Sequence, residues 1–220
     1  SRLSFCRLEY GNATGEDDYD MGGALYIYMS SPMLIEHSTI INNHADDRGG
    51  AIHIRYSSPA LRYLEISANS AVNNGGGIDL QGASPELSFC SINDNDAMIG
   101  GGIYYNEGSP KIFNTELIGN EASLHGGGLA INYLNPLDTL IMHNVLIAEN
   151  YAEEGGGLHV SDMGGIMNFN NVTFTENYAS LNGGGMLMYS GDPIFTNSIL
   201  WNNNSMISGN QVYLDGDGAD

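Results

Sequence analysis

The run Gly183-Gly184-Gly185-Met186 is one copy of a short phrase, two or three glycines followed by an apolar residue, that the chain repeats along its length. The other copies begin at Gly22, Gly49, Gly75, Gly100, Gly126 and Gly155, and a degenerate copy begins at Ser208. The third positions of successive copies are separated by 27, 26, 25, 26, 29, 28 and 26 residues. A repeat of this length indicates a solenoid, in which each repeat forms one coil.

Prolines and asparagines recur at fixed distances from the glycine runs. All six prolines lie eight residues after the third position of a copy: Pro32, Pro59, Pro85, Pro110, Pro136 and Pro193. An asparagine precedes that position by seven or eight residues: Asn43, Asn69, Asn95, Asn120, Asn150, Asn177 and Asn203. Glycine permits a sharp turn at positive φ, proline fixes φ, and stacked asparagines can bond through their side-chain amides. Each coil therefore has three predicted corners.

Apolar and polar residues alternate after each glycine run, as in Ile52-x-Ile54 and Leu158-x-Val160. Alternation with period two predicts strands, and no stretch keeps the 3.6-residue period of a helix. Three short strands per coil, stacked coil upon coil, make a parallel β-helix. We therefore predict an all-β, single-stranded parallel β-helix of about seven full coils, each 25–29 residues long.

The whole chain, residues 1–220, is predicted to be a single β-helical segment. Residues 1–21 resemble the end of a coil, and residues 209–220 resemble the start of another. Solenoids need capping elements at their ends, and we recognise none at either terminus. We therefore expect the chain to be a segment of a longer protein.

The charge of the chain excludes several classes of partner. There are 26 acidic and 6 basic residues, which gives a formal net charge of −20. Binding to nucleic acid or to an anionic membrane surface depends on Lys and Arg, so neither is predicted. No apolar run approaches the ~18 residues needed to cross a bilayer. The first residues lack the apolar region of a signal peptide, so any export signal is expected outside this chain.

The two cysteines, Cys6 and Cys90, hold equivalent positions three coils apart. At the spacing of stacked strands this separation is about 14 Å. A disulfide requires Cα atoms within about 7 Å, so we expect two free thiols.

Two features of the repeat resemble a known family. Gly22-Gly23-Ala24-Leu25 and Gly49-Gly50-Ala51-Ile52 match the GGA[ILV] motif of chlamydial polymorphic membrane proteins, and Phe174-Thr175-Glu176-Asn177 matches their FxxN motif. The chain also resembles Asn- and Gly-rich β-helix regions of large secreted bacterial proteins. The resemblance, together with the coil length, implies the right-handed form of the β-helix. It further implies a bacterial passenger of the autotransporter kind, displayed at the cell surface and acting in adhesion.

Outward side chains of the first strand in each coil form a candidate binding face. Its members are Tyr26, Tyr28, His53, Asp79, Tyr104, His159, Tyr189 and Tyr213. Aromatic side chains with hydrogen-bonding groups between them suit stacking on sugar rings. Tyr and His are also ordinary residues of exposed strands, so the pattern leaves both interpretations open.

The best candidate cluster on this face lies on three successive coils and consists of His53, Arg55, Asp79 and Tyr104. If the chain is an enzyme, Asp79, His53 and Arg55 are its candidate catalytic residues. A glycoside hydrolase needs carboxylates ~5 to 9.5 Å apart, and only Asp79 lies centrally. A pectate-type lyase would need calcium-binding aspartates and a basic residue, and only Arg55 stands near Asp79. We expect no enzymatic activity and keep polysaccharide cleavage as an alternative.

Acidic residues before the first two glycine runs form a candidate calcium site: Asp17, Asp18, Asp20, Asp46 and Asp47. Oxygen ligands from neighbouring coils could share one Ca²⁺ ion. A solvated acidic surface that keeps a long rod soluble explains the same residues. Calcium is therefore an open alternative, and no other cofactor is predicted.

Taken together, these features predict a non-catalytic, secreted or cell-surface β-helical stalk or adhesin passenger. It would present its binding face to an unidentified glycan or protein on a host or cell surface. A module that binds or cleaves polysaccharide is one alternative. A subunit of a self-assembling surface fibre, associating end to end, is the other.

Overall fold

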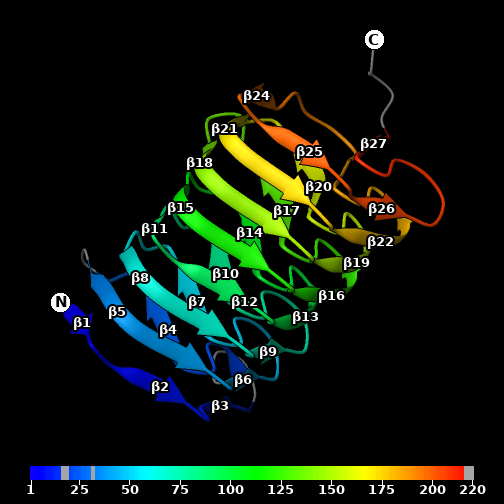
Figure 1. The fold of residues 1–220 in the computed structure, drawn as a ribbon. Helices are drawn as coiled ribbons and strands as arrows, with labels where there is room; N and C mark the ends of the chain where they lie inside the picture. The colour runs from blue at the N-terminus through cyan, green and yellow to red at the C-terminus, as the bar shows by residue number, and fades with distance from the viewer. Residues whose placement is uncertain (16–19, 31–32, 216–220) are drawn as a thin grey trace.

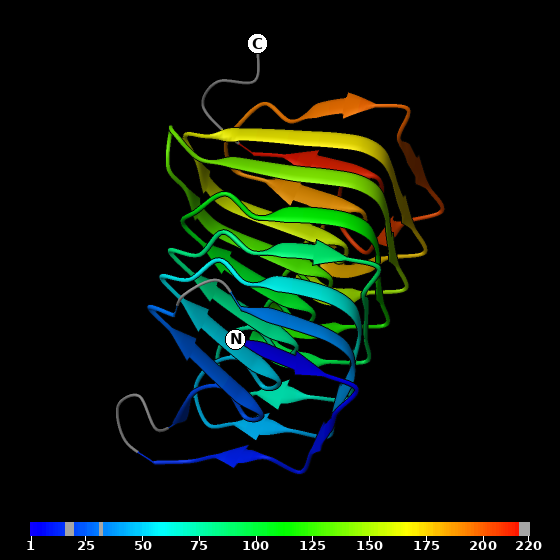
Figure 2. The ribbon, with the colours of Figure 1, turned by 90° about the vertical axis from the view of Figure 1, so that its left-hand side faces the viewer.

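The computed structural model describes residues 1–15, 20–30 and 33–215. In this part of the chain 27 strands follow one another as a solenoid, and every strand pair is parallel. Figures 1 and 2 show the coils stacked one upon another from the N-terminal to the C-terminal end. Among the described residues no helix is long and apolar enough to span a membrane.

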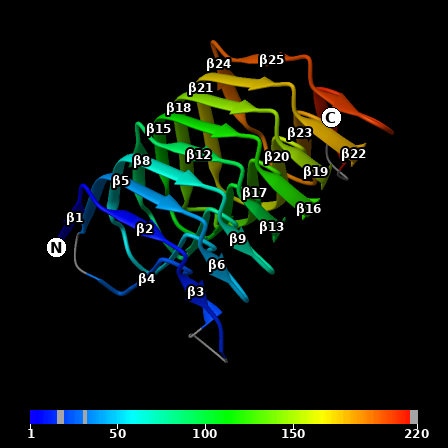
Figure 3. The same ribbon diagram turned by 60° about the horizontal axis from the view of Figure 1, so that its bottom comes forward.

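Three sheets run along the solenoid, and each coil contributes to all three (Figure 3). We call the sheet that follows the glycine runs sheet C. Its strands are β4 (Leu25–Tyr28), β7 (Ile52–Arg55), β10 (Ile78–Gln81), β14 (Ile103–Asn106), β17 (Leu129–Leu134), β20 (Leu158–Met163), β23 (Met186–Met188) and β27 (Val212–Leu214).

Sheet A follows sheet C in each coil and is the widest of the three. Its strands are β1 (Arg2–Ser4), β2 (Arg7–Glu9), β5 (Leu34–Ile41), β8 (Ala60–Ser67), β11 (Glu86–Ser88), β12 (Ser91–Asn93), β15 (Lys111–Ile118), β18 (Thr139–Ala148), β21 (Ile166–Thr175), β24 (Ile194–Thr196) and β25 (Ile199–Trp201). Strands of 8 to 10 residues occur here, longer than the short strands predicted. They bend at residues of positive φ such as His37 and Tyr63.

Sheet B closes each coil between the asparagine corner and the next glycine run. Its strands are β3 (Asn12–Ala13), β6 (His44–Ala45), β9 (Ser70–Ala71), β13 (Asp96–Ile99), β16 (Glu121–His125), β19 (Tyr151–Glu154), β22 (Tyr178–Asn182) and β26 (Asn204–Ser205). The order of sheets along the chain is therefore C, A, B, and then C of the next coil.

Equivalent residues of successive coils lie directly side by side. Ile52 of β7 pairs with Leu25 on one side and with Ile78 on the other, and Ile78 pairs in turn with Ile103. Alternate residues of these strands point inward, where Ile52, Ile54 and Leu80 are almost completely buried. Burial of one such side chain contributes about 1.5–3 kcal/mol, so every coil adds its own share of the core. The predicted β-helix, its parallel strands and its period-two core are confirmed.

The glycine corner is sharp because the first glycine of each run adopts a left-handed conformation. Its φ lies between 64° and 70° in all eight copies. At Gly155 a Cβ atom would lie 2.5 Å from the carbonyl oxygen of Leu158 and 2.8 Å from the Cβ of His159. The backbone therefore folds back over the strand that follows, and only glycine leaves room for this path.

The asparagine corner is a continuous ladder of buried amides, as predicted. The side-chain nitrogen of Asn95 donates to the side-chain oxygen of Asn120 at 2.9 Å, and Asn120 donates to Asn150 at 3.1 Å. The same amide group of Asn120 also donates to the carbonyl of Ile92, 2.9 Å away. Cys6 and Cys90 are both free thiols, which confirms the expectation from their spacing.

Candidate functional site

The outward face of sheet C is largely covered, and this corrects the prediction of an exposed binding face. Tyr26, Tyr28 and Tyr189 are exposed, and Tyr213 is half-buried. The other members are buried, with exposed fractions of 1% for His53, 0% for Asp79, 7% for Tyr104 and 2% for His159. The alternation of the strands is as predicted, but on β7, β10, β14 and β20 the first outward side chain is buried.

The glycine corner provides the cover. The residues immediately before the glycine runs stand in one column, because Arg48 pairs with Asn74, Asn74 with Ile99, and Ile99 with His125. The glycine that follows each of these residues turns the chain back over the outward side chain of the next strand. Gly155, for example, lies over His159, four residues later. We call this row of preceding residues the corner column: Met21, Arg48, Asn74, Ile99, His125, Glu154, Asn182 and Ser208.

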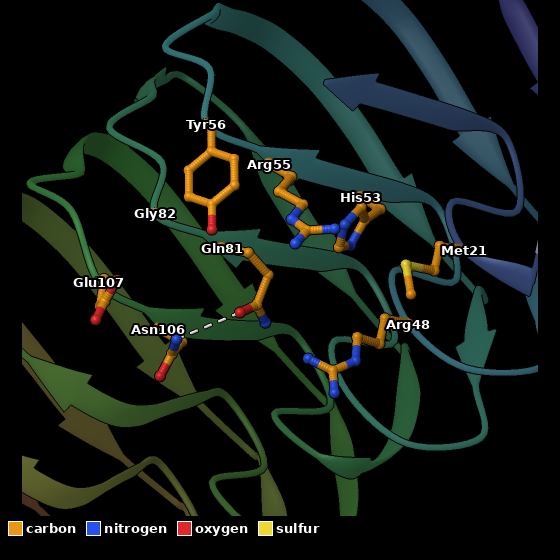
Figure 4. A pocket seen from close by; sticks show the side chains of 9 residues that line it. All are labelled: Met21, Arg48, His53, Arg55, Tyr56, Gln81, Gly82, Asn106 and Glu107. Carbon is orange, nitrogen blue, oxygen red and sulfur yellow. Dashed lines mark hydrogen bonds between the residues drawn. The ribbon is translucent and has the colours of Figure 1, made fainter. Parts of the chain in front are cut away.

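A pocket of roughly 260 Å³ opens where the corner column meets the outer side of β7, β10 and β14 (Figure 4). It is lined by Met21, Arg48, His53, Arg55, Tyr56, Gln81, Gly82, Asn106 and Glu107. Two of the six basic residues of the chain, Arg48 and Arg55, are in this lining. The lining also contains Glu107, and Arg48 is paired with Asp47 at 3.2 Å, so the pocket combines basic and acidic groups.

Arg55 is held at the pocket by aromatic rings. Its guanidinium carbon lies 5.2 Å from the ring centre of Tyr56 and 5.8 Å from that of Tyr28. A hydrogen bond with Tyr56 raises the pKa of Arg55. Tyr56 itself lies against Gly82, where a Cβ atom would be 2.6 Å from the tyrosine ring. The Tyr56 ring and the Arg55 guanidinium thus form one wall of the pocket.

Side-chain amides form the opposite part of the lining. Asn106 donates to the side-chain oxygen of Gln81 at 3.3 Å, and Asn132 donates to Asn106 at 3.0 Å. Gln81 in turn donates to Asp79 at 3.1 Å. This row crosses successive coils and offers donors and acceptors that could meet the hydroxyl groups of a ligand.

His53 and Asp79, from the predicted catalytic cluster, are brought together beneath the pocket. The Nδ1 atom of His53 lies 2.7 Å from Oδ2 of Asp79, although the contact is not aligned as a hydrogen bond. Both side chains are at most 1% exposed, so a polymer could not contact the carboxylate. Arg55, the third candidate catalytic residue, is the last residue of β7 and lines the pocket. The arrangement can orient a ligand above a polar floor.

The calcium prediction is only partly within the described residues, because Asp17 and Asp18 lie outside them. Asp47 contacts Arg48 at 3.2 Å and accepts a hydrogen bond from Asn73 at 2.8 Å. Asp46 contacts His44 at 3.2 Å and is exposed. One oxygen of Asp20 is buried without a hydrogen-bond partner among the described residues. Calcium binding at these aspartates stays a prediction.

A stack of aromatic rings along sheet A was missed by the sequence reasoning. Phe5, His37, Tyr63 and Phe89 stand one coil apart, with ring centres 5.0, 4.6 and 4.9 Å apart and planes within 8° of parallel. All four have positive φ. Their repeated spacing was visible in the sequence, but the backbone bend that turns these rings outward was not.

The comparisons with known proteins agree with this architecture. The model of the family described as "Right handed beta helix region" matches residues 22–198. No curated protein and no solved structure matches the chain. The match covers most of the repeats described above, and it confirms the predicted right-handed form. The chain therefore belongs to the right-handed β-helix family.

Proposed function

We propose that this chain is a non-catalytic, secreted or cell-surface β-helical segment that binds an acidic glycan in the pocket at Arg48 and Arg55. The observation that carries the proposal is the pocket itself, which places two arginines, an aromatic ring and a row of amides around one opening. The rod supplies a rigid support for this site. Secretion, display and an adhesin or stalk role rest on the resemblance of the repeats to chlamydial and other bacterial β-helical proteins.

The chemistry of the lining favours a carboxylated sugar. A guanidinium group binds a carboxylate through paired, charge-assisted hydrogen bonds. The amides of Gln81 and Asn106 can bond to sugar hydroxyls, and Tyr56 offers an aromatic edge beside them. The net charge of −20 repels anions at long range, but the field of exposed charges is screened beyond ~8 Å at physiological salt. Local contacts then determine binding.

The burial of His53 and Asp79 favours binding without cleavage. General acid or base catalysis requires the group to reach the bond that reacts, directly or through one water molecule. Asp79 is fully buried under the corner column and is already bonded to Gln81. Cleavage of polysaccharide is therefore the weaker alternative, and assembly into a fibre through the ends of the rod would be compatible with the same pocket.

The test is a calorimetric titration with a carboxylated oligosaccharide, oligogalacturonate, and with a neutral maltooligosaccharide of the same length. We expect binding of the acidic sugar only. Arg55→Gln should weaken it about tenfold or more, because a hydrogen bond to a charged group contributes about 1.5–3 kcal/mol. Arg62→Gln is the matched control, since Arg62 is an exposed arginine that pairs with Glu86 away from the pocket.

Three outcomes would contradict the proposal. Failure of the wild-type chain to bind oligogalacturonate would remove the acidic-glycan assignment. An equal loss of affinity in Arg55→Gln and Arg62→Gln would show that binding is a general charge effect and does not depend on the pocket. Formation of new reducing ends or unsaturated products during the incubation would show that the chain is an enzyme.

A further inference from the structure

The space between two successive residues of the corner column and the buried outward side chain beneath them occurs again further along the rod. We call this space a niche. In the first niche, Met21 and Arg48 belong to two successive corners and line the same pocket as His53. His53 lies four residues after Gly49, the first glycine of the second run. His125, Glu154 and His159 occupy the same three positions of the repeat. His125 ends β16 and pairs with Glu154, which ends β19, while His159 lies beneath Gly155. Here the niche is lined by metal-ligating side chains.

Three donor atoms converge in this second niche. Nδ1 of His125 lies 3.5 Å from Oε2 of Glu154, and Nε2 of His159 lies 3.9 Å from the same oxygen. One ligand atom from each of the three residues lies within 4.8 Å of the other two. The two imidazole rings are stacked with their centres 4.5 Å apart. His159 pairs with Ala130 of the preceding coil. The side chain of Ala130 is small and leaves room for the His125 ring.

The two histidine nitrogens form no hydrogen bond among the described residues, although both lie near Glu154. Nδ1 of His125 and Nε2 of His159 are both buried and accept or donate no hydrogen bond. His159 is only 2% exposed, so water does not replace the missing partner. A buried polar atom left unpaired is costly and calls for an explanation, such as an ion that it binds.

Surrounding groups favour the form of each ligand that binds a metal. Ser161 places its hydroxyl oxygen 3.4 Å from Nδ1 of His159, where it can accept a hydrogen bond from a protonated Nδ1 and leave the Nε2 lone pair directed into the niche. The hydroxyl of Tyr189 donates to Oε2 of Glu154 at 3.1 Å and orients the carboxylate.

We propose that His125, Glu154 and His159 bind one Zn²⁺ ion that joins two successive coils of the rod. Two imidazole nitrogens and one carboxylate oxygen are a donor set that suits zinc. With bonds of ~2.0–2.1 Å, tetrahedral zinc ligands stand ~3.3–3.5 Å apart, so donor atoms that lie up to 4.8 Å apart would approach one another by about 1.3–1.5 Å when the ion binds. Calcium would need six to eight oxygen ligands, which this niche does not offer. The partly exposed ring of His125 leaves a path by which the ion enters.

The test uses the tag-free chain after dialysis against a chelator. Titration with Zn²⁺ should show one ion bound per chain, and Co²⁺ should give the intense visible absorption of a tetrahedral N,O site. Zinc should raise the melting temperature, whereas Ca²⁺ at the same concentration should not do so through this site. His125→Gln and Glu154→Gln should each weaken zinc binding by more than about 100-fold, beyond the roughly 10- to 100-fold effect of losing an outer-shell contact.

His44→Gln is the matched control, because His44 also stands beside a carboxylate, Asp46, but on an open surface. It should bind zinc as the wild type does. The proposal is overturned if the wild type binds no zinc below millimolar concentration, if His125→Gln and Glu154→Gln both bind normally, or if His44→Gln loses as much affinity as they do. Far-UV circular dichroism establishes that each variant is folded. Should Glu154→Gln fail to fold, His125→Gln decides the test, since its side chain lies near the surface.

Discussion

At the scale of single residues, the first and third glycines of each run have different roles. Gly75 begins its run at φ 65°, and a Cβ atom there would lie 2.5 Å from the carbonyl oxygen of Ile78. Gly77, in the third position, does not have a positive φ, and the chain itself carries alanine at the equivalent positions 24 and 51. A Cβ atom at Gly77 would also be close to a backbone oxygen, 2.6 Å from that of Gly102, so the positive φ is what distinguishes the two positions. The first position requires glycine for its conformation, whereas the alanines at 24 and 51 show that the third accommodates a methyl group after a shift.

Gly75→Ala is accordingly expected to destabilise the fold more than Gly77→Ala. The left-handed conformation alone costs a residue with a Cβ atom about 1–2 kcal/mol, and the contact with Ile78 adds to it, so we expect a loss of at least about 2 kcal/mol for Gly75→Ala. Urea denaturation of both variants measures the difference. Equal losses, or a greater loss in Gly77→Ala, would contradict this account of the corner.

Cys90 gives a pH dependence at the same scale. Burial raises the pKa of its thiol from 9.0 to about 11. The unfolded chain therefore releases this proton first as the pH rises above 9, so stability present below pH 9 is lost between pH 9 and pH 11, by up to about 1.4 kcal/mol per pH unit. Cys90→Val should remove this part of the alkaline loss, because Val145 and Val172 occupy the equivalent position in later coils.

The measurement is the free energy of unfolding of wild type and Cys90→Val from pH 8 to pH 11 under reducing conditions. Tyrosines that titrate in this range are the same in both proteins, so the difference isolates the thiol. Parallel curves for the two proteins would show that Cys90 does not carry the effect. In the folded wild type, thiol reagents should modify the half-buried Cys6 before the buried Cys90.

At the scale of elements, the asparagine ladder fastens sheet A to sheet B in every coil. Each amide bonds both to the next asparagine and to a backbone carbonyl of the preceding coil. The rungs are buried, so no water replaces a missing group. A defect in one rung therefore removes hydrogen bonds from the asparagines on both sides of it.

Asn120→Ala should thus destabilise the chain by about 3 kcal/mol, because it leaves the backbone and side-chain nitrogens of Asn95 and the side-chain oxygen of Asn150 without this partner. Asn132→Ala, on an exposed strand with one bond to Asn106, should cost under about 1 kcal/mol. Denaturant midpoints of the two variants decide the point. A comparable cost for both would show that the ladder is no more important than an exposed amide pair.

At the scale of the whole molecule, the rod is a stack of interchangeable coils. Each strand pairs with its equivalent one coil before and one coil after, and core residues contact their counterparts in the same way. The stability of such a chain is close to a sum of terms for each coil and each interface between neighbours. The number of coils can therefore change without a change of fold.

Deletion of residues 75–99 removes one full coil and joins Asn74 to Gly100, two positions that already follow one another in the repeat. We expect a folded, cooperatively melting rod that is shorter by ~4.8 Å and less stable by one interface. Deletion of residues 75–87, about half a coil, joins the end of sheet B to sheet A and should prevent folding. Circular dichroism and small-angle X-ray scattering measure both variants, and two folded products would contradict the register described here.

Much of this fold was predictable from the sequence because each structural device recurs at the same step. The glycine corner, the asparagine ladder, the inward column of Ile52 and Ile54, and the two free cysteines were all predicted and are all present. The site was predicted less well. Arg55 was chosen and lines the pocket, but Arg48 and Met21 were not, because they lie in the corner and not on the strand.

The sequence by itself determined the coil: its length, its corners, and which residues of each strand point inward or outward. Only the tertiary structure decided which outward residues can be reached. Alternation fixes the side of a strand on which His53 or His159 stands, but their burial depends on the backbone path of the glycine corner, which bends over them from the preceding segment. The same path brings His125 and Glu154 over His159, although 34 residues separate the two histidines in the chain.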